Sequence, residues 1–166
     1  MDAYLKFEEP AIEGESLDKG HAKWIELTAW SWNLTMPMTE GKSSAGARTA
    51  GQIKADPFTV SKNMDKTSPK LFEHMCAGRH FKKVIIEIMR SVGEGNLGQK
   101  QTFCRYEMEH VVISTMAPDA GSDAPTERLT LDPGTVKFTY THNDQKTGKA
   151  TGKVEAAWDF LVNSKI

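Results

Sequence analysis

Two glutamates in one extended segment have the side-chain chemistry and the spacing of a catalytic carboxylate pair. Glu107 and Glu109 lie two positions apart in FCRYEMEHVVIST, so a strand points both carboxylates to the same side. Paired carboxyl groups carry out glycoside hydrolysis. The solvated wall of a β-sheet also places charged residues at this spacing, and we interpret Glu107 and Glu109 as part of such a wall.

The five histidines are scattered through the chain, at His21, His74, His80, His110 and His142. No two of them have the short strand spacing or the four-residue helical spacing that aims two imidazoles at one metal ion. The sequence therefore predicts no metal site.

Other catalytic motifs are missing from the sequence. It contains no GxSxG elbow, phosphate loop or dinucleotide fingerprint. GEGNLG, residues 93–98, has the composition of a phosphate cradle, but no helical pattern follows it, so we interpret it as a hairpin turn. Ser31 lies between Trp30 and Trp32 with no obvious base partner. We expect no cofactor and no enzymatic activity.

Length and charge narrow the function classes. The 166 residues fit one domain, 1–166, and 21 basic against 22 acidic residues leave a net charge of −1. No basic face for nucleic acid or anionic lipid is implied. The opening MDAYLKFEEP lacks signal-peptide features, and no apolar run approaches bilayer length, so we expect no membrane insertion and no use of the general secretory route. Cys76 and Cys104 are expected to be reduced thiols.

Short segments with alternating polarity run through the chain and must position these residues. Strands are predicted at 4–7, 24–34, 57–62, 82–90, 103–115, 126–132 and 134–142. The segment 154–163 is read as a further strand, with a helix as the alternative. Many short strands with turn signals predict an antiparallel β-barrel or sandwich.

The segment WIELTAWSWNL, from Trp24 to Leu34, has large apolar residues on both faces of a strand. A bulge near Thr28 would shift the alternation and send Ile25, Leu27, Trp30, Trp32 and Leu34 into one core. Coverage of the strand on both sides, by a partner subunit, is the alternative. The segment 82–90 is also apolar on both sides.

One short helix is predicted at about 69–77. Ser68 has the position of an N-cap, Pro69 suits the first helical turn and Gly78 suits the left-handed residue after the last turn. Leu71 and Phe72 belong to the apolar side of this helix, together with Met75 and Cys76. The helix is expected to plug or flank the sheet.

The stretch at about 36–56, MPMTEGKSSAGARTAGQIKAD, is rich in small and polar residues. Connections of this length are usually functional or disordered. It is either a surface loop or a docking arm that becomes ordered on a partner.

Several segments, in this order, resemble the Hcp family, the haemolysin-coregulated tube proteins of type VI secretion systems. They are GESLDKGHAKWIELTAWSWNL, FTVSKNMDKTSPKLFEHMCAGRH, EHVVIST and ERLTL. The resemblance implies a β-barrel that is flanked by a helix and assembles into hexameric rings. These rings would stack into a hollow tube, which contraction of the sheath expels from the cell. Implied partners are further copies of the chain, a VgrG-like spike protein, the sheath and baseplate, and small effectors in the lumen.

The resemblance also assigns positions. Ser31 and Ala29 would line the lumen, and Trp30 and Trp32, with Leu71 and Phe72, would form the structural core. Lys42, Arg48 and Lys54 would belong to an extended loop that reaches the next ring. The protein would be cytoplasmic before assembly and would leave through the apparatus, as a plain tube subunit. A monomeric, ligand-binding β-barrel is the alternative function.

Overall fold

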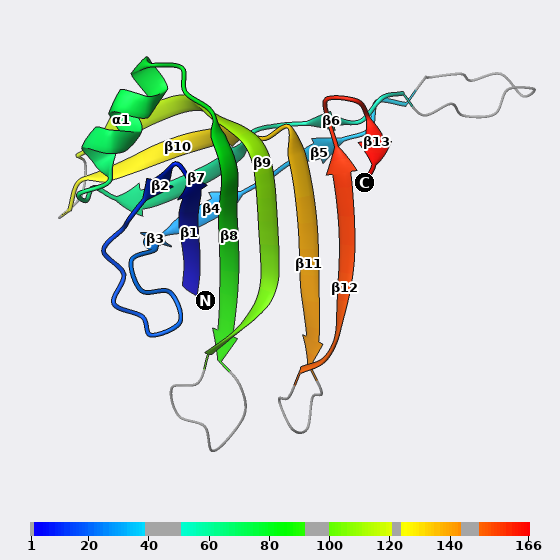
Figure 1. The fold of residues 1–166 in the computed structure, drawn as a ribbon, viewed down its shortest axis with the longest axis horizontal. Coiled ribbons are helices and arrows are strands. Elements are labelled where there is room, and N and C mark those ends of the chain that lie inside the picture. The colour runs from blue at the N-terminus through cyan, green and yellow to red at the C-terminus, as the bar shows by residue number, and fades with distance from the viewer. Residues whose placement is uncertain (1, 39–50, 92–99, 121–123, 144–149) are drawn as a thin grey trace, which may run out of the picture.

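The computed structural model describes residues 2–38, 51–91, 100–120, 124–143 and 150–166 (Figure 1). Within these residues it contains thirteen strands and one short α-helix, and all strand pairs are antiparallel. This confirms the predicted mainly β fold with one short helix.

The first sheet forms one wall of the molecule. Its long strands lie in the order β1 (Asp2–Glu9), β8 (Phe81–Ser91), β9 (Lys100–Asp119), β11 (Thr135–Asn143) and β12 (Ala150–Asp159). Two short strands, β2 (Ala11–Ile12) and β3 (Ile25–Leu27), pair with β1, and β13 (Ser164–Lys165) pairs with β12. The segment 154–163, whose type the sequence left open, is therefore strand up to Asp159, followed by a turn.

The second sheet shares strand β9 with the first. Its order is β9, β10 (Thr126–Asp132), β7 (Phe58–Asn63) and β4 (Ala29–Ser31). At His110 the backbone of β9 takes a φ of 54°, and the buried positions change from Met108 to Val111. This shift explains why Val111 and Ile113 break the alternation seen in the sequence, since the strand changes sheets there.

The break at Thr28 answers the question posed by the Trp24–Leu34 segment. Before it, β3 pairs with β1 of the first sheet; after it, β4 pairs with β7 of the second. Ile25 is fully buried, and Trp30 and Trp32 pack against the same core. The shifted alternation is thus correct for these residues, whereas Leu34 is 44% exposed.

Apolar side chains from both sheets fill the space between them. The largest fully buried ones include Phe7, Phe58, Phe81, Leu5, Ile25, Leu71, Ile86, Met108 and Leu129. On its opposite face, β8 buries Ile85 and Met89 within the single chain. The two-sided apolar pattern of 82–90 therefore needs no partner subunit to cover it.

Helix α1 (Ser68–Cys76) lies over one end of the two sheets (Figure 1). Its N-cap is Thr67, one residue before the predicted one, and Gly78 takes a φ of 59° after the last turn, as expected. Leu71 is fully buried and Met75 packs against the core. Phe72 is 60% exposed, so its assignment to the core was wrong: it lies one residue, about 100°, around the helix from Leu71.

A buried ionic cluster joins the start of α1 to the second sheet. Lys62 of β7 lies directly across from Glu127 of β10, with 2.7 Å between Nζ and Oε1. The Lys62 ammonium also donates to Asp65 Oδ1 at 2.8 Å, and Ser68 Oγ donates to Glu127 Oε1 at 2.6 Å. The side chains of Lys62 and Glu127 are 1% and 0% exposed. Ser68, predicted as the N-cap, thus binds the sheet instead.

Candidate assembly surfaces

The two glutamates considered for catalysis have different surroundings on β9. Glu107 is held by Arg105, with 2.9 Å from Nε to Oε1, and by Lys83 at 3.4 Å, while Glu109 is exposed. Among the described residues, no group of three or more histidine, cysteine or carboxylate side chains is placed to hold a metal ion. The surfaces of the molecule, rather than a cleft, carry its distinctive chemistry.

Small and hydroxyl side chains cover the outer face of the second sheet. In register across the strands, Ala29 lies opposite Ser61, Ser31 opposite Thr59, and Thr130 opposite both Thr59 and Thr115. We call this surface the hydroxyl wall; its members are Ala29, Ser31, Thr59, Ser61, Thr115, Ala117, Arg128 and Thr130. Each is exposed or half-buried, and all but Arg128 have small or hydroxyl side chains.

Aromatic rings support the hydroxyl wall from behind. Trp32 stacks on Phe58 with 4.3 Å between ring centroids, and Trp30 lies 5.5 Å from Tyr106. Tyr106 in turn stacks on Phe138 at 4.7 Å, and burial raises the pKa of its phenol. Trp30 and Trp32 are half-buried and contact this cluster. Because side chains alternate along a strand, Ala29 and Ser31 point away from these rings.

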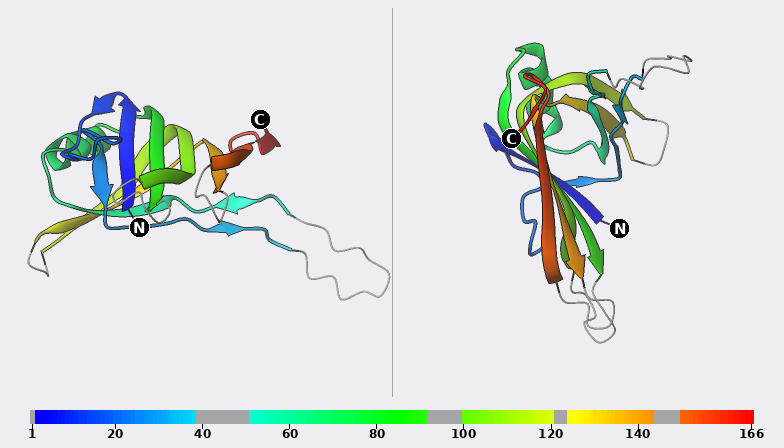
Figure 2. Two further views of the ribbon diagram at one scale, coloured as in Figure 1. Left: turned by 90° about the horizontal axis from the view of Figure 1, so that it is seen from below. Right: turned by 90° about the vertical axis from the view of Figure 1, so that its right-hand side faces the viewer.

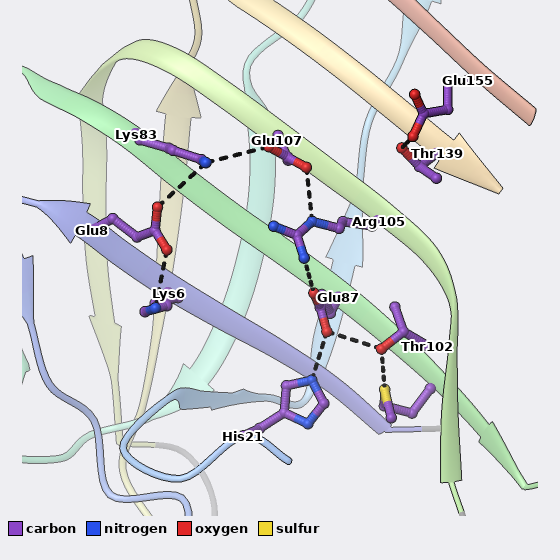
Figure 3. A network of polar contacts seen from close by, with 11 residues as sticks. Lys6, Glu8, His21, Lys83, Glu87, Thr102, Arg105, Glu107, Thr139 and Glu155 are labelled. Carbon is purple, nitrogen blue, oxygen red and sulfur yellow. Dashed lines mark hydrogen bonds and ion pairs between the residues drawn. The ribbon is translucent and has the colours of Figure 1, made fainter. Parts of the chain in front are cut away.

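Paired charges cover the outer face of the first sheet (Figure 3). We call this chain of ion pairs the charge ladder; it runs through Lys6, Glu8, Lys83, Glu107, Arg105 and Glu87. The shortest contact joins Arg105 Nη1 to Glu87 Oε1 at 2.6 Å. Each member already has a partner of opposite sign, so this face has little free charge with which to attract another protein.

A narrow ribbon extends away from both sheets (Figure 2). It consists of β5 (Leu34–Thr35) and β6 (Lys54–Ala55), and its base is fastened by the Trp32 indole, which donates to the Asp56 carbonyl at 2.9 Å. Lys54 is exposed on β6. Lys42 and Arg48, also expected in the stacking loop, lie outside the described residues.

The two flanks of the first sheet expose apolar side chains. At the β12 flank, the turn after Asp159 leaves Leu161, Val162 and Ile166 between 68% and 71% exposed; we call these three the C-terminal patch. On the side of β12 away from β11, the described residues pair only with Trp158 and Asp159. At the opposite flank, the segment between β2 and β3 exposes 94% of Leu17.

A ligand-binding barrel would need a hollow interior, and here the space between the sheets holds fully buried side chains. The depressions found on the described surface are open, such as one of about 350 Å³ beside Leu17 and Asp65. Residues 4–140 match the family described as "Type VI secretion system effector, Hcp". The chain belongs to the Hcp family.

Similar proteins agree with this assignment. Protein hcp1 of Pseudomonas aeruginosa is 26% identical over 165 residues, covering 98% of this chain and 97% of the relative. A solved type six secretion system protein has a TM-score of 0.87 and 31% identity over 99% of both chains. Hcp1 from Salmonella typhimurium, at 24% identity, covers 99% of this chain and 98% of its own with a TM-score of 0.77, a likeness of fold.

Membership in the Hcp family confirms the resemblance seen in the sequence. The chain is a structural subunit of the type VI secretion tube, secreted through that system, and it associates with further copies of itself. The monomeric ligand-binding alternative is not favoured. Within the described residues, no helix is long and apolar enough to cross a membrane.

The structure also shows surfaces that the sequence reasoning missed. In the sequence, the only signal of the charge ladder is opposite charges two residues apart, at Lys6 and Glu8 and at Arg105 and Glu107. The hydroxyl wall extends well beyond Ala29 and Ser31, and its signal was the alternation of Thr and Ser with apolar residues in FTVSK and TERLTLD. Leu17 and the C-terminal patch carried no periodic signal.

Proposed function

We propose that the chain forms hexameric rings with the hydroxyl wall facing the lumen. The observation that carries this proposal is the contrast between the two outer faces. The second sheet offers small, uncharged side chains around Ser31, with Arg128 as the one charged member of the hydroxyl wall, whereas the first sheet carries the charge ladder. A wall of mostly short, uncharged side chains would let proteins of different shapes travel inside the tube without holding them tightly.

Ring closure requires two different flanks on each subunit. A cyclic assembly uses head-to-tail contacts, in which one patch meets another patch of the next copy. The C-terminal patch with the free edge of β12 lies at one end of the first sheet, and Leu17 lies at the other (Figure 1). Exposed apolar side chains at both ends support a lateral contact between these flanks.

We infer that the ribbon of β5 and β6 reaches the adjacent ring. Its projection from the sheets and the exposed Lys54 support this role. Removal of residues 39–50 keeps the bond between Trp32 and Asp56 and is expected to leave rings that stack weakly. Normal tubes and normal secretion by this deletion variant would contradict a stacking role for the loop that the ribbon carries.

The remaining partners follow from the same assembly. The tube would carry a VgrG-like spike at its tip, would be enclosed by a contractile sheath on a baseplate, and would shelter small effectors in its lumen. Each subunit would be cytoplasmic before assembly and would perform no catalytic step. Neither nucleic acid nor a membrane is part of this proposal, which agrees with the net charge of −1.

Native mass spectrometry of the purified chain, with negative-stain images of the same sample, tests the ring. The expected result is a mass six times that of the subunit, with annular particles. A chain that stays monomeric at high concentration and low salt would contradict the proposal, and the ligand-binding alternative would then be tested by quenching of tryptophan fluorescence.

The orientation of the wall needs a separate test. In a Cys76→Ser background, Ser31→Cys is labelled with biotin-maleimide, and Lys82→Cys, whose side chain is 80% exposed in the parent, is the matched control. Streptavidin is expected to bind both labelled monomers, but only the Lys82→Cys variant once rings have stacked. Equal binding to both stacked samples would place the hydroxyl wall outside the tube.

A further inference from the structure

The segment 13–24, between β2 and β3, is fastened to the first sheet by one buried histidine. The side chain of His21 is 4% exposed and lies between two carboxylates. Its Nδ1 is 3.1 Å from Asp18 Oδ1, and its Nε2 is 2.8 Å from Glu87 Oε2 of β8 (Figure 3). Both ring nitrogens thus face acceptors, one in the segment itself and one in the sheet.

Only one charge state of the imidazole satisfies both contacts. An ionised carboxylate accepts hydrogen bonds and has no proton to donate. A neutral imidazole has one N–H group, so it can donate to Asp18 or to Glu87, whereas the protonated ring donates to both. A neutral ring therefore keeps its bond to β8 only by leaving Asp18 without this donor, and addition of one proton satisfies both carboxylates at once.

The surroundings of His21 favour a defined ring position. The imidazole stacks on Tyr4 of β1 with 4.3 Å between centroids and an 8° interplanar angle, and it meets the edge of Trp24 at 4.9 Å. Arg105 donates to Glu87 Oε1, and Thr102 of β9 donates to the same Oε2 atom that His21 contacts. Arg105 and Thr102 thus hold the Glu87 carboxylate in place from the sheet side.

Further charges lie around this pair and affect its titration. The groups nearest to Tyr4 and Trp24 are Asp2, Lys6, Asp18, Glu26 and Lys100. Lys100 is paired with Asp2. Asp18 is the group most directly coupled to His21: the hydrogen bond with that imidazole lowers the pKa of the Asp18 carboxyl.

The segment has other anchors that do not involve the His21 ring. Ser16 Oγ donates to Glu26 at 3.0 Å, and Glu15 accepts from the backbone N–H of Lys66 at 3.1 Å. These contacts hold the first part of the segment. His21 anchors its second part, and Leu17, between the two, is 94% exposed at the flank of the sheet.

We propose that His21 is a proton-dependent clamp that holds the segment 13–24, which carries Leu17, on the first sheet. The clamp is closed when the imidazole is protonated and loosens when the ring loses that proton. Where Leu17 takes part in the lateral contact, ring formation is then favoured at lower pH; this consequence rests on the proposed function.

Hydrogen–deuterium exchange of the full chain, together with ¹⁵N shifts of the His21 ring, tests the clamp. Between about pH 5.5 and about pH 8.5, exchange of the segment is expected to rise about tenfold after correction for the intrinsic rate, as one charge-assisted bond is lost. The exposed His80→Gln variant is the matched control and keeps this response. Equal protection at both pH values, or a neutral ring at the lower one, would overturn the proposal.

Two variants separate the clamp from a merely structural role. His21→Gln is expected to exchange fast at both pH values. Asp18→Asn removes one of the two acceptors, so a neutral imidazole satisfies the site, and the segment is expected to stay protected at both. A tenfold response that persists in Asp18→Asn would contradict the need for the proton.

Native mass spectrometry at the same pH values tests the consequence for assembly. Rings that dissociate as the segment loosens support it, and rings equally abundant at both pH values contradict it while leaving the proposed tube intact. A chain that forms no rings at any pH would refute the hexameric ring, whereas the exchange data would still decide whether His21 is a clamp.

Discussion

The charge ladder and the buried ionic cluster use the same residue types at opposite extremes of burial. In the ladder, the side chains of Lys83 and Glu107 are 35% and 26% exposed. In the cluster, those of Lys62 and Glu127 are 1% and 0% exposed. Water solvates the ladder and weakens each pair, whereas the cluster has only its own members to stabilise its charges.

The position of each cluster explains this difference. The ladder lies on the outer face of the first sheet, where His21 of the segment 13–24 contacts its member Glu87. The cluster lies where α1 closes one end of the barrel, and Ser68 of the helix donates directly to Glu127. Similar ion pairs thus lie on the solvated face of the first sheet in the ladder, whereas in the buried cluster they attach helix α1 to the second sheet.

Loss of one partner in the buried cluster is expected to have the largest effect. Lys62→Met leaves the Glu127 carboxylate buried without its cation and should lower the free energy of unfolding by about 3–5 kcal/mol. Urea denaturation measures this loss. The double variant Lys62→Met/Glu127→Leu removes both charges and should recover most of it, so a double variant as unstable as the single one would contradict a purely electrostatic penalty.

Apolar packing of the helix gives the next effect and tests whether the cluster alone attaches α1. Leu71→Ala should lower the free energy of unfolding by about 2–5 kcal/mol, because it empties a fully buried position. Phe72→Ala, one residue further along, is the control and should change it by less than about 0.5 kcal/mol. Equal losses in thermal denaturation would show that Phe72 packs inside the protein.

The loss of stability at acidic pH gives a third test of the buried cluster. We call the part of the curve where the free energy of unfolding falls with pH the acid limb. Burial raises the pKa of Asp65, but hydrogen bonds from Lys62 and Thr67 lower it more, so it lies below its usual value. Asp65 therefore stabilises the fold above about pH 4 and loses this contribution as pH falls through its folded pKa. Asp65→Asn should cost about 1–3 kcal/mol at neutral pH and flatten the acid limb. An unchanged limb would contradict this.

The charge ladder is expected to give the smallest effect. Lys83→Ala removes the ammonium shared by Glu8 and Glu107 and should lower the free energy of unfolding by about 0.2–1 kcal/mol, less at high salt. Lys62→Met, in the dry cluster, should show little dependence on salt. A large, salt-independent loss for Lys83→Ala would mean that the ladder is as dry as the buried cluster.

Much of the local structure could be predicted because it depends on near neighbours. Pro69 and Gly78 bracket the helix to within one residue at each end, and the alternation in 57–62 and 126–132 predicts the strands β7 and β10. The resemblance to Hcp proteins rested on ordered sequence segments and was confirmed. Ala29 and Ser31 were correctly placed on one exposed face, although their role in the lumen remains a prediction.

The sequence by itself determined the strand and helix segments and the family, since backbone preferences and alternation act over a few residues. Only the tertiary structure decided which face of each element is covered. Thr28 and His110 are where strands change sheets, Lys62 is buried with its charge paired to Glu127 of β10, and Phe72 is exposed. These outcomes depend on contacts between residues distant in sequence, which local periodicity does not encode.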